Sequence, residues 1–234
     1  MNMRESPAMT DYRELRWGNL NTPRFRHLKL LLYWPVYGLL FLLAERGGFI
    51  TQYTPVYCPL DDAIPFCEYF VIPYLLWFAF LVFIHLYTLL FDVAAFKKLM
   101  WFIIVTYSIT IAVYFLFPTC QELRPAAFER DNIFTRFLTG FYQFDTNTNV
   151  CPSIHVIGSV AVMLAAWDSK GLQTLSWKAA FGVLAFLISI STVFLKQHSI
   201  LDVFAAVPVC VVGYLLAYRP WRAPKQPGHK EGRA

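Results

Sequence analysis

Charge is what this sequence has least of. Only 15% of its 234 residues are Asp, Glu, Lys or Arg, whereas 57% are hydrophobic and 18% are aromatic. Soluble domains are about 45–50% apolar, so this composition excludes an ordinary soluble domain and indicates a membrane protein. The length suits one helical bundle rather than two domains.

A cleavable signal peptide is also missing, and so is any internal repeat. The first 25 residues are polar and contain no early apolar core. We interpret residues 1–27 as a cytoplasmic or interfacial N-terminal segment, with the first apolar run as an uncleaved anchor. Residues 219–234 are rich in Pro, Gly, Lys and Arg and are expected to form a solvated, basic cytoplasmic tail.

Long apolar runs fill the chain between these two segments. They cover approximately residues 28–44, 69–91, 99–117, 153–167, 177–195 and 199–218. Each is close to the ~20 residues that a helix needs to cross ~30 Å of hydrocarbon. None is divided into the alternating segments of about ten residues that mark a membrane β-barrel. We therefore expect an all-α fold, an integral-membrane six-helix bundle over residues 28–218.

The basic residues predict the orientation of this bundle. With six helices both termini share one side, and most of the 20 Lys and Arg residues fall there. The opposite side holds only Arg46, Arg124, Arg130, Arg136 and Lys196. Positive residues mark the cytoplasmic side, so both termini are expected to be cytoplasmic. The net charge of +5 then reflects topology and anionic lipid, and it gives no support for nucleic-acid binding.

Three short polar segments stand out on the predicted outer side. They are ELRPA (122–126), CPSIHV (151–156) and KQHSILD (196–202). The first lies in the second outer loop, the second opens the fourth helix, and the third opens the sixth helix. Because all three lie at the same membrane depth, their side chains can converge.

The residue types in these segments suit attack on phosphorus. His198 and Asp202 are spaced i, i+4 and so lie on one helix face. The carboxylate can accept the proton of one imidazole nitrogen, which leaves the other nitrogen free as a nucleophile. Pro152 and Ser153 are typical of a helix first turn, whose unpaired N–H groups bind anions. His155 adds a general acid in the same turn.

Two cations complete the predicted set. Arg124 offers a planar fork for phosphate oxygens, and Lys196 offers a point charge. A nucleophile, an orienting carboxylate, a general acid and an electrostatic clamp that includes Ser153 are the parts that phosphoryl transfer requires. Because these cations and the helix N-terminus supply a positive field, no metal or other cofactor is expected.

Simpler interpretations stay open at this stage. A single intramembrane histidine is often only packed and hydrogen-bonded, which is how we interpret His85. The pair of His198 and Asp202 alone would equally suit a structural contact or a proton relay. A zinc site is another alternative, although these residues lack the close spacing of common zinc motifs.

At these residues the sequence resembles the type 2 phosphatidic acid phosphatase superfamily, the integral-membrane lipid phosphate phosphatases. That signature reads Lys-x6-Arg-Pro, then Pro-Ser-Gly-His, then Ser-Arg-x5-His-x3-Asp. The matching positions, within a resemblance over roughly residues 60–218, are Arg124, Pro125, Pro152, Ser153, His155, Ser191, His198 and Asp202. The resemblance implies the six-helix plan and a phosphohistidine on His198. It also implies that Asp202 orients this ring, that His155 protonates the leaving oxygen, and that Arg124 and Ser153 hold the phosphate.

Three positions depart from the signature and indicate which branch of the superfamily the sequence resembles. Phe117 occupies the position of the first lysine, Ile154 that of the glycine, and Thr192 that of the arginine. Lys196 is the candidate to replace one missing cation. This thinned pattern is similar to the branch that contains inositol phosphorylceramide synthase, with sphingomyelin synthases more distant, and those enzymes transfer a phospho-headgroup between lipids. A diester carries less charge than a phosphate monoester, so fewer cations suffice.

We therefore expect a multi-pass enzyme of the cell membrane with its active site on the non-cytoplasmic face. It would remove a phosphate or phospho-headgroup from a membrane lipid through a phosphohistidine. Phospho-headgroup transfer to an alcohol is the first alternative, and a non-catalytic transporter or lipid-binding protein is the second. A transporter should carry ionisable residues near the midplane of several helices. The sequence leaves the lipid, the acceptor and the oligomeric state open.

Cysteines gather on the predicted outer side. Cys58, Cys67, Cys120 and Cys151 lie in or beside the two outer loops, and Cys210 lies inside the last apolar run. Export favours disulfides, but the pairing cannot be read from sequence, and reduced, semi-buried cysteines are the alternative. The first outer loop, rich in Tyr, Pro and Phe, is predicted to be an ordered interfacial cap.

Overall fold

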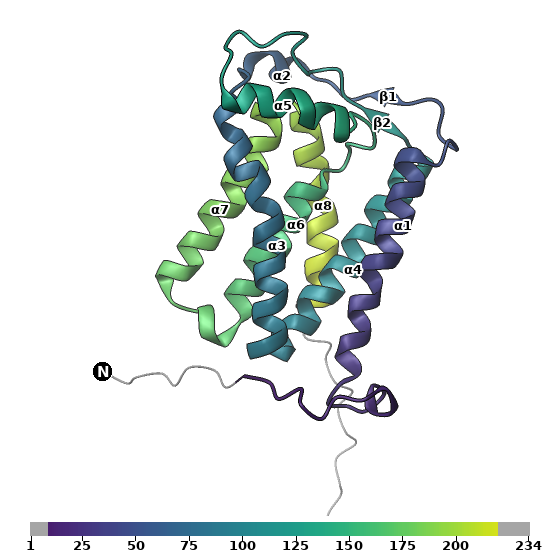
Figure 1. Ribbon diagram of the computed structural model, residues 1–234, viewed down its shortest axis with the longest axis vertical. Coiled ribbons are helices and arrows are strands. Elements are labelled where there is room, and N and C mark those ends of the chain that lie inside the picture. Colours follow the sequence, from purple (N-terminus) through teal and green to yellow (C-terminus); the bar gives the residue numbers. More distant parts are fainter. Residues whose placement is uncertain (1–8, 220–234) are drawn as a thin grey trace, which may run out of the picture.

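The computed structural model describes residues 9–219, of which the great majority are helical (Figure 1). The all-α prediction is confirmed, and every predicted apolar run is a helix. The long helices are α1 (Tyr33–Arg46), α3 (Val71–Phe91), α4 (Val93–Leu116), α6 (Ile154–Asp168), α7 (Leu175–Phe194) and α8 (Ile200–Ala217). Short 3-10 helices are η1 (Trp17–Asn19), η2 (Arg26–Leu32), η3 (Glu68–Phe70) and η4 (Lys170–Leu172).

Within residues 9–219, five helical segments are long and apolar enough to cross a membrane. They are Arg26–Arg46, Glu68–Phe91, Val93–Leu116, Leu175–Phe194 and Ile200–Ala217. The sixth apolar helix, α6, has only 15 residues, which is about 22 Å of rise against ~30 Å of hydrocarbon. A multi-pass membrane architecture is supported, whereas six crossings and cytoplasmic termini stay predictions.

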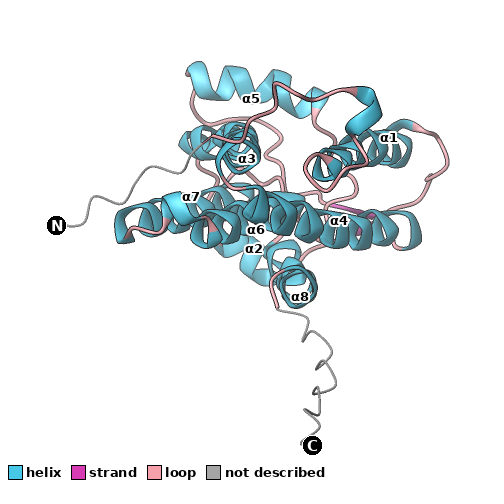
Figure 2. Cartoon of the chain, turned by 90° about the horizontal axis from the view of Figure 1, so that it is seen from below, coloured by secondary structure: helices cyan, strands magenta, loops and turns pink. Residues whose placement is uncertain are grey.

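Helix α6 is the centre of the bundle and packs against α3, α4, α7 and α8. Small side chains let its neighbours approach closely, as is common between membrane helices. Gly158 is a closely packed position on α6: a Cβ there would lie 2.8 Å from both Trp77 Nε1 and Tyr107 Oη. Helix α1 packs on α4 and η2, at the periphery of the bundle (Figure 2).

A polar cap covers one end of the bundle. It contains α2 (Pro59–Ala63), α5 (Ile133–Phe144) and two short parallel strands, β1 (Thr54–Pro55) and β2 (Thr119–Cys120). Asn132 starts α5, because its side chain accepts hydrogen bonds from the backbone N–H groups of Phe134 and Thr135. Helix α5 lies across the bundle axis (Figure 2). The predicted ordered cap over the first outer loop is thus accompanied by an unpredicted helix in the second.

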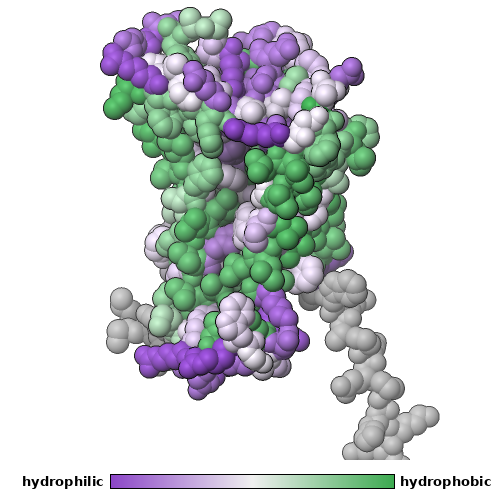
Figure 3. All heavy atoms as spheres, turned by 45° about the vertical axis from the view of Figure 1, so that its right-hand side comes forward, coloured by the Kyte–Doolittle hydropathy of each residue, from purple (hydrophilic) through white to green (hydrophobic). Residues whose placement is uncertain are grey.

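Hydrophobic atoms form a belt between this cap and the opposite polar end (Figure 3). The ends of the described chain lie together at that opposite end (Figure 1): Thr10 N donates to Leu90 O, and Lys98 lies 5.9 Å from the Tyr218 ring. This grouping accords with the charge distribution in the sequence. The first eight residues and the predicted basic tail beyond Arg219 lie outside the described residues.

All five cysteines are free thiols in the structure. Cys120 and Cys210 are buried, and Cys58, Cys67 and Cys151 are partly buried. The possibility of reduced, packed cysteines left open by the sequence is therefore the arrangement observed. Burial raises the pKa of the Cys151 thiol to about 12, so this thiol stays protonated at neutral pH and is a poor nucleophile.

Candidate functional site

His198 lies in the turn that leads into α8, and its ring faces Asp202 in the first turn of that helix. Asp202 Oδ2 is 3.1 Å from His198 Nδ1 and also accepts the backbone N–H of Ser199 at 3.0 Å. Asp202 is fully buried and His198 nearly so. With this carboxylate as acceptor, Nδ1 carries the proton and Nε2 is left with its lone pair. The predicted i, i+4 pairing is observed.

His155 lies in the first turn of α6, with its ring packed between Tyr74 and Trp77, whose centroids are each 4.4 Å away. The His155 and His198 rings lie edge to face with centroids 5.7 Å apart. Two imidazoles from segments more than forty positions apart in the sequence therefore meet at one place. The aromatic packing fixes the orientation of His155 without a carboxylate partner.

A cavity of about 500 Å³ contains both imidazoles in its wall. The other walls come from the outer ends of α1, α3 and α4 and from the segment that leads into α6. Its charged lining consists of Glu45, Arg46 and Asp145. Among the lining residues, Arg46 is the single Lys or Arg, and the sequence analysis did not select it.

Arg124 does not line this cavity. Its guanidinium donates to the carbonyls of Tyr142, Asp145 and Thr146 and to Gln197 Oε1. It also lies 4.5 Å from the Tyr142 ring. Burial lowers the pKa of Arg124, although it stays charged in proteins. Arg124 therefore fastens the end of α5 to the turn before His198 and is not brought to the cavity wall beside the two histidines.

Lys196 is also directed away from the cavity. Its Nζ donates to the carbonyls of Asp61, at 2.6 Å, and Ile64. Burial lowers the pKa of its ammonium group. Its backbone has φ +53°, a left-handed conformation, which turns the chain sharply before His198. The structure thus assigns Lys196 to joining α2 to this turn and does not bring it to the phosphate position expected from the sequence.

Ser153 is the N-cap residue of α6, and its backbone N–H donates to Asp202 O at 3.2 Å. Its hydroxyl is buried without a hydrogen-bond partner and lies outside the cavity lining. The residue after it, Ile154, does line the cavity. The start of α6 is therefore at the cavity, while the backbone N–H of Ser153 joins α6 to α8.

Asp61 is a site residue that sequence reasoning missed. Its carboxylate is fully buried and accepts hydrogen bonds from Ser199 Oγ at 2.6 Å, Ile200 N at 2.8 Å and Cys58 N at 2.9 Å. Asp61 thereby caps α8 from another segment, with its negative charge at the positive end of the helix. The only signal in the sequence was an acidic pair in the first outer loop.

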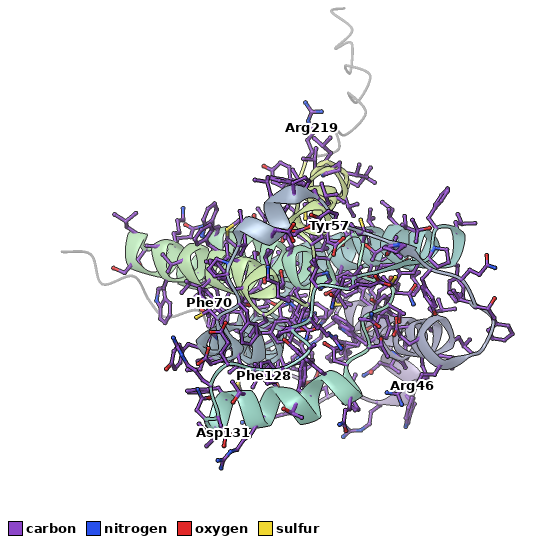
Figure 4. The ribbon with its side chains drawn as sticks, turned by 90° about the horizontal axis from the view of Figure 1, so that it is seen from above. Arg46, Tyr57, Phe70, Phe128, Asp131 and Arg219 are labelled. Carbon is purple, nitrogen blue, oxygen red and sulfur yellow. The ribbon has the colours of Figure 1, made fainter. Side chains whose placement is uncertain are left out.

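Glu45 and Arg46 end α1 at the rim of the cavity. Glu45 accepts hydrogen bonds from Thr146, Thr148 and Asn149. Arg46 donates to Phe144 O at 3.2 Å, and Figure 4 shows it at the end of α1 near α5. The sequence analysis missed both residues, although a Glu-Arg pair directly after the first apolar run could have identified them as candidates. Glu45 is therefore occupied in holding the segment before α6, and Arg46 is exposed beside the cavity.

Asp145 contributes a second acid to the cavity. Its Oδ2 accepts a hydrogen bond from Tyr74 Oη at 3.0 Å, and Tyr74 in turn packs on His155. Burial raises the pKa of Asp145. The sequence analysis did not select this residue, whereas in the structure it supports the ring that packs on His155.

Within residues 9–219, no group of three or more His, Cys, Asp or Glu side chains is arranged to hold a metal ion. Comparisons with protein-family profiles, with curated proteins and with solved structures find no significant match. The resemblance to lipid phosphate phosphatases therefore rests on the motif residues alone.

Proposed function

We propose that the protein is an integral-membrane enzyme that removes a phosphate or phospho-headgroup from a lipid through a phosphohistidine on His198. The observation that carries this proposal is the pairing of two imidazoles, 5.7 Å apart between centroids, in the wall of one cavity. One imidazole is paired with a buried carboxylate and the other is held by two aromatic rings. This asymmetry suits one nucleophile and one acid–base group.

The proposed reaction has two steps. His198 Nε2 attacks phosphorus, the bond from phosphorus to the leaving oxygen breaks, and His155 gives that oxygen a proton. Water or an alcohol then attacks the phosphohistidine, the P–N bond breaks, and His155 takes the proton of the entering hydroxyl. Asp202 stabilises the positive charge that develops on the His198 ring. Membership of the type 2 phosphatidic acid phosphatase superfamily is part of this proposal.

Arg46 and the N-terminus of α6 are the proposed phosphate-binding groups. Both are at the cavity, in contrast to Arg124 and Lys196, whose donors are used on backbone carbonyls. A guanidinium can bind two phosphate oxygens at once, and helix N–H groups favour anions. In this proposal, Arg46 and the N-terminus of α6 supply the positive field that the sequence analysis expected from Arg124 and Lys196.

The charge of the cavity favours phospho-headgroup transfer as the second candidate. Two acids, Glu45 and Asp145, line it with one Arg. A monoester dianion meets stronger repulsion from these acids than a diester monoanion does. Under this candidate an alcohol replaces water in the second step. We place the site on the non-cytoplasmic face of the cell membrane, because the basic residues gather at the other end of the bundle.

Phosphate release tests the proposal. Purified protein in detergent, with a chelator present, is offered phosphatidate, isoprenyl diphosphate, sphingolipid phosphates and phosphatidylinositol, and both products are identified by mass spectrometry. His198→Ala and His155→Ala are expected to abolish turnover per folded molecule, with thermal unfolding recorded alongside because both rings are buried. His27→Gln, at the far end of the bundle, serves as the control. Full turnover by His198→Ala would refute the mechanism, and absence of turnover by the unchanged protein would favour the non-catalytic alternative.

A further inference from the structure

Helix α5 carries an apolar stripe along one side. Its four residues are spaced 4, 3 and 4 positions apart, which puts them on one narrow line along the helix. They are Ile133, Phe137, Gly140 and Phe144, and we call them the α5 stripe. Ile133, Phe137 and Phe144 are 77%, 45% and 74% exposed. Among the described residues, a Cβ on Gly140 would meet no neighbouring atom within 4 Å. The stripe is therefore open along its whole length.

The opposite side of α5 is the side that packs on the bundle. Leu138 is fully buried in a cluster with Val71 and Tyr74 of α3. Tyr142 Oη donates to Leu195 O at 2.6 Å. Because successive residues turn by about 100° in a helix, Leu138 and Tyr142 lie on the far side from the stripe. Figures 2 and 4 show α5 at the margin of the bundle, outside α3. The α5 stripe therefore faces away from the bundle axis.

The two flanks of the stripe differ in character. On one flank the side chains are polar and exposed, and they are Arg136, Thr139 and Gln143. On the other flank, Phe134 and Phe141 pack on Tyr69 and Tyr74, with ring centroids 5.4 and 5.7 Å apart. Around the helix, a polar flank is thus followed by an open apolar stripe and then by contact with the bundle. This distribution is typical of a helix that lies in the plane of a membrane interface.

The contacts of α5 also set its level along the bundle. Val71 and Tyr74, on which it packs, lie in the first turn of α3, and the apolar span that contains α3 starts at Glu68. Ile72, in the same turn, is 51% exposed. At this level the hydrophobic belt meets the polar cap (Figure 3). The α5 stripe therefore adjoins a surface that already faces lipid, at the edge of the hydrocarbon.

A protein partner would need a larger surface than this stripe provides. Helix α5 has 12 residues, which is about 18 Å of helix, and with a width of ~10 Å one side of it offers about 200 Å². A stable protein interface buries ~800 Å² on each partner. A lipid surface has no such minimum, because it continues from the belt of the bundle onto the stripe. The area and the level of the stripe therefore favour lipid.

We propose that the α5 stripe binds the phospholipid surface of the leaflet at the cap end of the bundle. Ile133, Phe137 and Phe144 are inserted at the boundary between headgroups and acyl chains, where the apolar face of an amphipathic helix is buried by about 5–10 Å. Helix α5 is thus an interfacial helix, additional to the helices that cross the membrane. The inference does not rest on the proposed reaction, because it uses none of the catalytic side chains.

Photo-cross-linking in phosphatidylcholine nanodiscs tests this contact. A benzophenone-bearing amino acid replaces Phe137 in one full-length protein and Gln143, the matched exposed control on the polar flank, in another. Thermal unfolding of both should match that of the unchanged protein. Mass spectrometry is expected to find phosphatidylcholine adducts at position 137 and none at position 143. Adducts to a second copy of the chain in place of lipid, or lipid adducts at both positions or at neither, would overturn the proposal.

Thiol labelling gives a second measurement on the same two positions. Phe137→Cys and Gln143→Cys proteins in these nanodiscs are treated with a water-soluble maleimide, and the peptide that contains α5 is quantified by mass spectrometry, so that the native cysteines do not interfere. Because the thiolate is the reactive form and needs water, labelling at position 137 should be lost while position 143 is labelled. After unfolding in dodecyl sulfate both should be labelled alike. Equal labelling in intact nanodiscs would place the stripe in water and refute the proposal.

Discussion

Asp61→Ala is the substitution that tests most sharply how the outer cap positions His198. Asp61 contacts neither the cavity nor the histidine, and it acts through Ser199 and Ile200 at the start of α8. Its removal leaves a buried hydroxyl and a helix N–H without their acceptor. The start of α8 then loses its side-chain connection to the first outer loop, while Lys196 still donates to the backbone carbonyls of Asp61 and Ile64.

The magnitude follows from these contacts. Hydrogen bonds to a charged acceptor contribute about 1.5–3 kcal/mol each, and the carboxylate also interacts with the α8 dipole. Part of this loss will appear as lower stability. Displacement of a nucleophile by about 1 Å can cost on the order of a hundredfold in rate. We therefore expect kcat to fall at least about tenfold in the folded fraction, with little change in KM because Asp61 does not line the cavity.

Phosphate release per folded molecule measures this effect, with thermal unfolding in detergent recorded alongside. Asp61→Asn should recover part of the rate, because the amide oxygen can accept one of the three hydrogen bonds. Asp62→Ala is the matched control: Asp62 is the exposed neighbour, and its carboxylate pairs with Tyr57. If Asp61→Ala lowers the unfolding temperature but keeps full kcat, the cap stabilises the fold without positioning His198.

Three further predictions concern the cavity and its support. Arg46→Ala should raise KM about tenfold through loss of a charge-assisted contact to phosphate, and Arg46→Lys should recover part of it; an unchanged KM would return that role to another group. Because burial raises the pKa of Asp145, the folded protein holds this proton more tightly than the unfolded chain, so stability should fall as pH rises from about 3.9 through the raised pKa. Asp145→Asn should remove that fall in thermal unfolding curves, and an identical pH profile would contradict it. Gly158→Ala should destabilise the bundle by about 1–3 kcal/mol through contact with Trp77 and Tyr107, seen as a lower unfolding temperature; unchanged stability would mean that α3 and α4 can move aside.

The helices and the pair of His198 and Asp202 could be predicted from the sequence, because both depend on local spacing. Apolar runs of about twenty residues specify membrane helices, and an i, i+4 pair specifies one helix face. His155 could be added because its helix starts at the same predicted depth. These inferences need no knowledge of how distant side chains pack.

The cations were harder to assign, because the sequence gives charge but not direction. Lys196 lies two residues before His198, yet a left-handed turn points it at the first outer loop. Arg124 lies in a motif, yet it donates to the carbonyls at the end of α5. The sequence analysis did not predict α5, because this segment is rich in polar residues and was interpreted as a loop. Arg46 is the last residue of α1 and Asp61 lies in the short helix α2, and how these elements pack near His198 depends on tertiary contacts.

The shortness of α6 has a consequence for lipid traffic. Its inner end is tied to α4 by the pair of Lys98 and Asp168, so its 15 residues leave the opposite end about 8 Å short of a full crossing. Because four longer helices surround α6, its start lies below the outer end of the bundle, at the cavity. A catalytic site recessed at this depth, open to one side of the membrane, would take its lipids from a single leaflet. Its turnover rate would then depend on how fast lipids cross from the other leaflet.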